Sequence, residues 1–370
     1  LYHLIFVVKI KNIMKVCILG SGLTTLTTAK ALINQGIYVD ILFESKKKNE
    51  NKTRTLGISK SSIEFFNKDI LNIEKFLWDI LKIEIFSENL GDEKVLNFED
   101  KNKRLFSIIK NYELSNYLLR ELKKSKLFKI KKKIINHNTI QNNYKLIINC
   151  DLNNQITKNY FFKKINKNYR SNAYTAIISH KKMSTNNIAT QIFTKRGPIA
   201  FLPISEDQTS IVYSVRDGKN FEFKKIIERY NTKYEIKKIS ESISFNLKSS
   251  VLRSYQYKNI LAFGDLLHRI HPLAGQGFNM TIRDIKVLVN LIKFKINHGL
   301  DLDNSICMDF EKLTRHKNYI FANGIDLIYE FFNFESKYDN KAFSKLVQLI
   351  GKNNTTNKVF KKIADIGIPI

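Results

Sequence analysis

The N-terminal part of the chain shows short apolar runs on either side of a helical pattern. The run Lys15–Leu19 is almost entirely apolar, which is typical of a buried strand. A helical pattern follows over residues 26 to about 34, and Gly36 stands where glycine commonly ends a helix. A second apolar run, Tyr38–Phe43, predicts another buried strand. This order predicts one βαβ unit of a parallel sheet.

The middle and the end of the chain have different patterns. An amphipathic helix is expected over residues 111–122, with Leu114, Leu118 and Leu122 on one face. A strand is expected within 144–151 and a further β segment within 77–86. Beyond residue 300 the pattern is mostly helical. Between these parts, short β-like runs separated by turns predict an inserted antiparallel sheet, with strands at 176–179, 189–193, 199–203 and 210–214.

The turn after the first predicted strand has the glycine spacing of a dinucleotide-binding loop. Gly20 allows the tight turn, Gly22 lets backbone N–H groups approach a pyrophosphate, and the helix dipole adds to the attraction. Thr25 replaces the third glycine of this motif, which serves close packing of helix on strand. Glu44 ends the second strand, 24 positions after Gly20, where a carboxylate can bind ribose hydroxyls.

A second concentration of special residues lies within 260–279, the stretch around which we expect the chain to be organised. An apolar run at 260–263 predicts a strand, and a helical pattern resumes after Phe278. Glycine and proline clusters mark backbone that takes special dihedral angles or approaches a ligand closely. The chain has only four prolines and fourteen glycines, yet between strand and helix stand Gly264, Asp265, Pro272, Gly275 and Gly277.

The charge of the chain is strongly positive. It has 62 basic and 34 acidic side chains, a net charge of +28 at pH 7. A nucleic acid or a membrane surface would explain this excess, and so would a general drift of composition toward Lys, Asn and Ile. The lysines are spread widely, with one dense run at 123–133. Because no nucleic-acid-binding motif is present, nucleic acid is not expected as a partner.

Cysteine and histidine spacing gives no metal site. Cys17, Cys150 and Cys307 lie far apart, which fits a reducing cytoplasm. His268 and His271 have a spacing that can place two ligands on one helical face, but Pro272 follows directly and no third ligand is near.

The first residues and the overall hydropathy bear on location. No segment reaches the length of about 20 apolar residues that a transmembrane helix needs. Residues 1–13 lack the leading positive charge and cleavage site of a signal peptide, and Met14 opens a strand-like run. We therefore expect residues 1–13 to lie upstream of the true start.

Residues 264–279 closely resemble the GD motif of the group A FAD-dependent aromatic monooxygenases: they read GDLLHRIHPLAGQGFN. Within that group, the chain is similar to the ubiquinone-biosynthesis hydroxylases. Supporting matches occur at residues 54–59, 109–118 and 193–212 and at Arg283-Asp284, so the resemblance covers residues 14 to about 335.

The resemblance implies a mixed α/β fold, with a Rossmann-like FAD-binding domain, an inserted antiparallel-sheet substrate domain and a C-terminal helical region. We expect the FAD-binding domain in residues 14–75, 106–169 and 251–300. The substrate domain is expected in residues 76–105 and 170–250, and the C-terminal helices in residues 301–370.

The resemblance also implies positions for FAD. Glu44 would bind the adenosine ribose, and Asp265 the ribityl or pyrophosphate oxygens. Residues 272–277 would pass along the isoalloxazine ring, and Asn279 would sit near its pyrimidine edge. Arg54, His268 and Pro272 are the candidates nearest the ring, and no residue is assigned a catalytic role. The full set of implied cofactor-binding residues is Gly20, Gly22, Thr25, Glu44, Arg54, Asn111, Asp151, Gly264, Asp265, Pro272, Gly275, Gln276, Gly277, Phe278 and Asn279.

The implied reaction is hydroxylation of a polyprenylated phenol or quinol precursor of ubiquinone. NADH or NADPH would reduce FAD, O₂ would react with reduced FAD, and the resulting C4a-hydroperoxide would transfer one oxygen to the ring. Because the cofactor performs this chemistry, no acid–base constellation is needed. The substrate resides in membranes, so the resemblance implies a cytoplasmic protein at the inner membrane surface, with a quinone-biosynthesis complex or a homodimer as possible assemblies.

Three departures from the family pattern leave alternatives open, and one of them is that the segment between Leu122 and Asp151 is shorter than the family leads us to expect. The family has an Asp-Gly motif that helps to bind FAD and the nicotinamide, and here Leu152 follows Asp151. Thr281 also stands where glycine is usual. The alternatives are a non-catalytic FAD-binding subunit of a quinone-biosynthesis complex, or another flavin oxidoreductase such as a prenyl-chain reductase or a halogenase.

Overall fold

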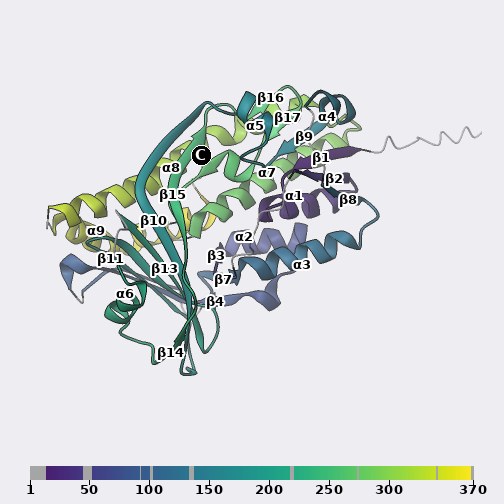
Figure 1. Cartoon of the computed structure of the whole chain (residues 1–370). Helices are drawn as coiled ribbons and strands as arrows, with labels where there is room; N and C mark the ends of the chain where they lie inside the picture. The colour runs from purple at the N-terminus through teal and green to yellow at the C-terminus, as the bar shows by residue number, and fades with distance from the viewer. Residues whose placement is uncertain are drawn as a thin grey trace, which may run out of the picture.

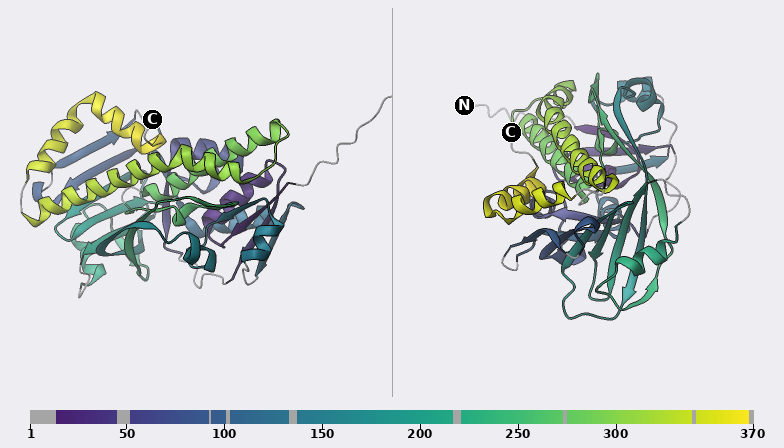
Figure 2. Two further views of the ribbon diagram at one scale, coloured as in Figure 1. Left: turned by 90° about the horizontal axis from the view of Figure 1, so that it is seen from above. Right: turned by 90° about the vertical axis from the view of Figure 1, so that its left-hand side faces the viewer.

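The computed structural model describes residues 14–44, 52–91, 93–100, 103–132, 137–216, 221–272, 275–338 and 341–367. These residues form three sheets, and long C-terminal helices lie along one side of them (Figure 1, Figure 2). The expectation about residues 1–13 falls outside the described residues. The predicted mixed α/β fold is confirmed.

A six-stranded sheet contains the predicted βαβ unit. Its strand order is β16-β17-β9-β1-β2-β8, and β1 pairs in parallel with both β2 and β9. The helix α1 (Leu23–Ile33) begins directly at the glycine turn, earlier than predicted, because Gly22 is its N-cap. The strands are β1 (Lys15–Leu19), β2 (Tyr38–Phe43), β8 (Phe128–Lys132), β9 (Leu146–Asn149), β16 (Gln256–Tyr257) and β17 (Ile260–Ala262).

The core of this half lies on both faces of the parallel sheet. The apolar residues of β1, β9 and β17 have no exposed surface, as expected for parallel strands covered by helices. The predicted helix α3 (Asn111–Lys123) places Leu114, Leu118 and Leu122 in this core, and α7 (Gln276–Asn297) also packs there. Residues between these strands form the short helices α4 (His137–Asn143) and α5 (Gln155–Tyr160).

A nine-stranded sheet forms the second half of the molecule. The predicted antiparallel pairing is confirmed for most of it, while β5 and β11 pair in parallel. The expected domain boundaries at 169/170 and 250/251 fall within β10 and β15, so that division stays a prediction. The strands are β5 (Lys82–Ser87), β6 (Lys94–Glu99), β10 (Lys164–His180), β11 (Ile188–Thr194), β12 (Gly197–Pro203), β13 (Gln208–Arg216), β14 (Ile236–Ile239), β15 (Ile243–Leu252) and β18 (His268–Arg269), with α6 (Phe223–Tyr230) after β13.

A three-stranded sheet joins the two halves. It consists of β3 (Thr55–Ser59), β7 (Phe106–Lys110) and β4 (Trp78–Ile80), so the β segment predicted at 77–86 is two strands in different sheets. Ser59 ends β3 and caps α2 (Lys60–Phe65), its side chain accepting a hydrogen bond from the backbone N–H of Ser62.

The C-terminal region is helical, as predicted. It comprises α8 (Asn304–Lys337), α9 (Ala342–Lys352) and α10 (Asn354–Ile366), and α8 runs along the outside of the molecule past both large sheets (Figure 2). Among the described helices, none is long and apolar enough to cross a membrane.

Asn279 fixes the start of α7 against β3. Its side-chain oxygen accepts a hydrogen bond from the backbone N–H of Ser59 at 3.0 Å, and its side-chain nitrogen donates to the carbonyl of Gly57 at 3.0 Å. The residue is 1% exposed, so both backbone groups depend on this amide. Asn279 thereby closes a contact between segments 220 residues apart.

We expect Asn279→Ala to lower the free energy of unfolding by about 2–4 kcal/mol, because two buried backbone groups would each lose a partner. Asn323→Ala is the matched control, since Asn323 is exposed on α8 and donates to the carbonyl of Tyr319 of its own helix. Urea unfolding measures both. Equal stability of the two variants would show that the Asn279 bridge contributes little.

Candidate flavin site

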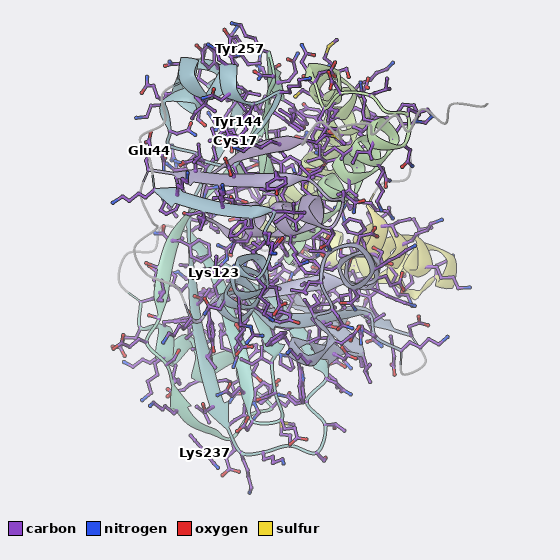
Figure 3. The ribbon with its side chains drawn as sticks, turned by 90° about the vertical axis from the view of Figure 1, so that its right-hand side faces the viewer. Cys17, Glu44, Lys123, Tyr144, Lys237 and Tyr257 are labelled. Atoms are coloured by element: carbon purple, nitrogen blue, oxygen red, sulfur yellow. The ribbon has the colours of Figure 1, made fainter. Side chains whose placement is uncertain are left out.

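The candidate site lies at the carboxyl ends of four neighbouring parallel strands. Gly20 follows β1, Glu44 follows β2, Asp151 follows β9 and Gly264 follows β17. Strands β2 and β9 flank β1 on opposite sides, so the chain leaves β1 at a point where the connections diverge. Ligands of open α/β sheets bind outside the carboxyl ends of the strands at such a point, and we call this region the crevice. Glu44 is visible at the end of its strand in Figure 3.

The glycine turn packs tightly on one side and is open on the other. Gly20 has φ +125°, and a Cβ there would lie 3.0 Å from Thr25 Oγ1 and 3.5 Å from the backbone nitrogen of Asp151. A Cβ on Gly22 would meet nothing within 4 Å. Thr25 is buried and occupies the place predicted for close helix–strand packing. The open side of the turn is therefore at Gly22, the N-cap of α1.

The turn at Gly264 touches the same helix end. Gly264 has φ +64°, and a Cβ there would lie 2.6 Å from Thr24 Cγ2 in the first turn of α1. Asp265, the next residue, is exposed within the short 3₁₀ turn Gly264–Leu266. The contact thus brings together the two glycine motifs that the sequence placed far apart.

Asp151 is held within its own loop. Its carboxylate accepts a hydrogen bond from the backbone N–H of Asn153 at 2.8 Å, and its own N–H donates to Asn149 Oδ1 at 3.1 Å. Leu152 is half-buried and packs against the main core. The segment that departs from the family pattern is therefore an ordered loop at the edge of the crevice.

A second group of predicted residues lies around β3. Asn111 donates its backbone N–H to the carbonyl of Arg54 at 3.0 Å, and the Arg54 side chain is exposed. Two hydroxyl pairs on either side of Arg54, Thr53 with Thr175 and Thr55 with Ser210, link this segment to the antiparallel sheet. Arg54 therefore stands where the three-stranded sheet meets the nine-stranded sheet.

The end of the GD block packs on the same strand. Gly275 has φ +65° and is the N-cap of α7, and a Cβ there would lie 3.1 Å from the backbone nitrogen of Gly57. The helix begins at Gln276, three residues before the predicted start, and the side chains of Gln276 and Phe278 are buried. Leu273 and Ala274 of this block lie outside the described residues. Pro272 is half-buried.

His268 takes part in a buried network that the sequence did not reveal. Its Nε2 lies 2.7 Å from Asp284 Oδ2, and Asn318 of α8 donates to Asp284 Oδ1 at 3.0 Å. His268 and Asp284 are 2% and 1% exposed. The network joins β18, α7 and α8, so it positions the strand that precedes Pro272. The partner lies 16 residues along the chain, and no short motif connects the two.

His271 is buried, and neither of its ring nitrogens has a hydrogen-bond partner among the described residues. Its ring stacks on Tyr329 at 4.1 Å between centroids and meets the edge of Tyr169 at 5.1 Å. Burial, and after it the charge of Arg216, lowers the pKa of His271 to about 3. The imidazole is therefore neutral at physiological pH. Among the described residues, no group of three or more metal-ligating side chains comes together.

The residues at the strand ends fit FAD by two observations. The N-terminus of α1 has no side-chain cap, no acidic residue in its first turn and open space at Gly22, so its N–H groups suit a pyrophosphate. The side-chain oxygen of Gln276 is buried without a hydrogen-bond partner at the start of α7, where a bound polar ring would supply one. Gly20, Gly264 and Gly275 all have positive φ where a backbone must approach closely.

Comparison with known proteins shows what this chain is similar to. A protein-family model described as an FAD binding domain matches residues 210–299. The chain is 24% identical over 242 residues to the "Ubiquinone biosynthesis monooxygenase COQ6, mitochondrial" of Schizosaccharomyces pombe, covering 52% of this chain and 50% of the relative. It is 26% identical over 153 residues to the "3-demethoxyubiquinol 3-hydroxylase" of Escherichia coli, covering 39% of each. The chain thus spans about half the length of the COQ6 relative and 39% of the length of the Escherichia coli relative.

Solved structures share the fold over nearly the whole chain. The p-nitrophenol 4-monooxygenase PnpA of Pseudomonas putida has a TM-score of 0.76 at 11% identity, covering 96% of this chain and 98% of that chain. HpxO of Klebsiella pneumoniae, solved with FAD and uric acid, has a TM-score of 0.73 at 11% identity, covering 96% and 97%. The flavin-dependent halogenase CmlS also shares the fold, with a TM-score of 0.65 at 14% identity over 82% and 62%. The chain therefore has the fold of the FAD-dependent monooxygenases, and its predicted resemblance to the ubiquinone-biosynthesis hydroxylases is confirmed.

Proposed function

We propose that this protein is an FAD-dependent monooxygenase that hydroxylates the aromatic ring of a polyprenylated ubiquinone precursor, using NADH or NADPH and O₂. The observation that carries the proposal is the contact between Gly264 and Thr24, which joins the two glycine motifs into one crevice. Similarity to COQ6 and to the 3-demethoxyubiquinol 3-hydroxylase supports the choice of substrate class.

Each strand end has a proposed task in holding the cofactor. Gly20 and Gly22 form the turn that holds the pyrophosphate against the N–H groups of the first turn of α1, while the Gly20 N–H itself donates to the carbonyl of Leu42 at 2.9 Å. Glu44 accepts hydrogen bonds from the adenosine ribose, and Asp265 accepts them from ribityl hydroxyls. Arg54 and Pro272 would lie nearest the ring. Bound FAD supplies the redox chemistry with O₂, which no protein side chain provides.

The antiparallel sheet is proposed to cover the substrate. Thr53 and Thr55 contact this sheet on both sides of Arg54, so the covering strands are fixed relative to the ring's end of the crevice. Residues Gly197-Pro198 and Leu202-Pro203 of β12 are the candidates that lie over the flavin. Such a cover excludes water from the reacting atoms, which in this class of reaction protects the oxygen-transfer step.

A separate part of the proposal is that NADH or NADPH reduces the flavin. Asp151 stands at the family's nicotinamide-linked motif, but Leu152 replaces glycine and its side chain packs on the core. The second candidate function rests on this observation: an FAD-binding subunit of a quinone-biosynthesis complex that nicotinamide does not reduce. A flavin oxidoreductase of another kind remains the third, since the halogenase CmlS shares the fold.

The substrate class also bears on location. A polyprenylated phenol resides in the bilayer, so we propose that the protein is cytoplasmic and binds the inner membrane peripherally. The net charge of +28 favours an anionic leaflet, at about 1 kcal/mol for each lysine or arginine near the surface. Partners in a quinone-biosynthesis complex or a second copy of the chain are compatible with this arrangement.

Asp265→Ala should abolish flavin retention. The purified wild-type protein is expected to be yellow with about one FAD per chain, and the variant to keep less than about a tenth, because a charge-assisted hydrogen bond contributes about 1.5–3 kcal/mol. Absorbance of the purified proteins measures this, with Asp309→Ala of α8 as an exposed control. Stoichiometric FAD in Asp265→Ala would refute the site, and a colourless wild-type protein would refute every flavin function.

Leu152→Gly should affect reduction of the flavin more than its binding. NADH or NADPH is expected to bleach the wild-type flavin under anaerobic conditions, and Leu152→Gly to accelerate bleaching about tenfold, which corresponds to ~1.4 kcal/mol of the barrier. Leu152→Ala is the control that shortens the side chain without restoring glycine's backbone freedom. A yellow wild-type protein that neither nucleotide reduces would favour the non-catalytic subunit.

A further inference from the structure

The outward side of α8 carries a line of large apolar and aromatic side chains. Successive members are seven, seven, four, three and four residues apart, the spacing that keeps them on one side of a helix. Each is between 43% and 61% exposed, although helices normally bury such a line. We call this set the α8 stripe: Leu313, Ile320, Leu327, Phe331, Phe334 and Tyr338.

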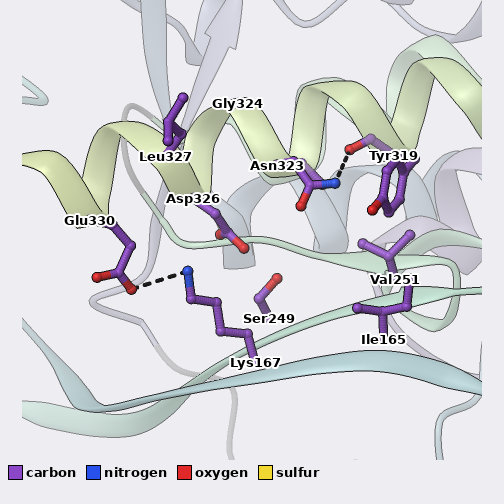
Figure 4. Close-up of a pocket in the computed structure, with 11 residues that line it drawn as sticks. Ile165, Lys167, Ser249, Val251, Tyr319, Asn323, Gly324, Asp326, Leu327 and Glu330 are labelled. Atoms are coloured by element: carbon purple, nitrogen blue, oxygen red, sulfur yellow. Dashed lines mark hydrogen bonds and ion pairs between the residues drawn. The ribbon is translucent and has the colours of Figure 1, made fainter.

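A cavity of about 420 Å³ opens beside the stripe, between α8 and the strands β10 and β15 (Figure 4). This volume lies within the range of ligand pockets. Leu327 belongs to both the stripe and the cavity wall, and Ile165 of β10 and Tyr319 of α8 are also large, exposed and apolar at its lining. The apolar surface of the stripe therefore continues into the protein.

The acidic groups of the cavity are already paired. Glu330 binds Lys167 with 3.1 Å between Oε1 and Nζ, and Asp326 accepts a hydrogen bond from the Tyr169 hydroxyl. Burial raises the pKa of Asp326, with the Tyr169 bond opposing the shift. The negative charge of Glu330 is therefore offset by Lys167, and the Asp326 carboxyl is engaged by the Tyr169 hydroxyl.

Basic and apolar side chains lie together where β10 begins and β15 ends, beyond the strands that line the cavity. Lys163 precedes β10 and Arg253 follows β15, both are exposed, and Arg253 donates its backbone N–H to the carbonyl of Lys163 at 3.0 Å. Phe162, next to Lys163, is 61% exposed. Cationic side chains beside exposed aromatic rings are the composition that binds the interface of an anionic bilayer.

The dense lysine run at residues 123–133 is the alternative surface for membrane binding. Lys129, Lys131 and Lys132 of β8 are exposed, but the apolar residues between them, such as Ile130, pack against the core. Moreover, β8 is one edge of the parallel sheet, and α8 contacts β16 and β17 at the other edge. The β8 face offers charge without apolar surface, and interfacial binding needs both.

We propose that the α8 side is the surface by which this protein docks on an anionic bilayer, with the α8 stripe in the interfacial layer and the adjacent cavity receiving the end of a lipid-borne apolar chain. The choice of a bilayer rests on the proposed function, because a membrane-resident substrate requires such a contact. A docking face on α8 also brings β10 and β15, which continue into the antiparallel sheet, close to the membrane surface.

Sedimentation with vesicles of phosphatidylcholine, alone or mixed with phosphatidylglycerol, tests the proposal on the full chain. Leu327→Ser/Phe334→Ser should lower the partition coefficient onto the mixed vesicles at least about tenfold, because two exposed side chains would no longer enter the interface. Phe294→Ser is the matched control, since Phe294 of α7 is 56% exposed and lies outside the stripe. It should stay within about twofold of wild type, as should Lys129→Glu/Lys131→Glu.

Three outcomes would overturn the proposal. The first is a wild-type protein that does not bind the mixed vesicles. The second is loss of binding in Lys129→Glu/Lys131→Glu with full binding in the stripe variant, which would place docking on β8. The third is a wild-type dimer that the stripe variant converts to a monomer in light scattering, which would make a second copy the occupant. Vesicle binding needs no turnover, so a failed hydroxylase assay leaves this result interpretable.

Discussion

Gly264 has no room for a Cβ because Thr24, in the first turn of α1, lies against its Cα, and the rest of the candidate site depends on this contact. It brings the turn after β17 onto the helix that starts after β1. A Cβ on Gly20 would lie 3.0 Å from Thr25 Oγ1 and in ordinary contact, at 3.5 Å, with the backbone after β9. The carboxyl ends of β17, β9 and β1 are thereby closed into one crevice, with the N-terminus of α1 open toward it.

The GD block divides into residues that face this crevice and residues that hold it in place. Asp265 is exposed beside the Gly264 contact, while His268 and Asn279 are buried and bonded within the protein. His268 connects β18 to α7 and α8 through Asp284, and Asn279 fixes the start of α7 on β3. Both ends of the loop that contains Pro272 are therefore anchored, which is the condition for a rigid wall beside a planar ring.

The local pattern of apolar and polar residues predicted the strands and helices. It did not predict which segments distant in the sequence contact one another. The strands β1, β2 and β17 and the helix α3 are continuous apolar or amphipathic segments, and their boundaries follow closely from the sequence. The Asn279 bridge to Gly57 and Ser59 spans more than 200 residues and leaves no periodic signal. The residues of the α8 stripe have a helical spacing that can be recognised in the sequence, but the same spacing is typical of a buried face. Only the structure shows that these residues are exposed. The strand ends could be assigned to FAD only through the resemblance carried by residues 264–279.

Titration of FAD into flavin-free protein tests the central contact most directly, with Gly264→Ala compared with Gly299→Ala. The two glycines have φ +64° and +66°, so alanine is strained equally at both, but only at Gly264 does a Cβ meet Thr24. This account predicts that Gly264→Ala weakens FAD binding at least about tenfold, while Gly299→Ala stays within about twofold of wild type. Equal FAD affinity in the two variants would contradict it.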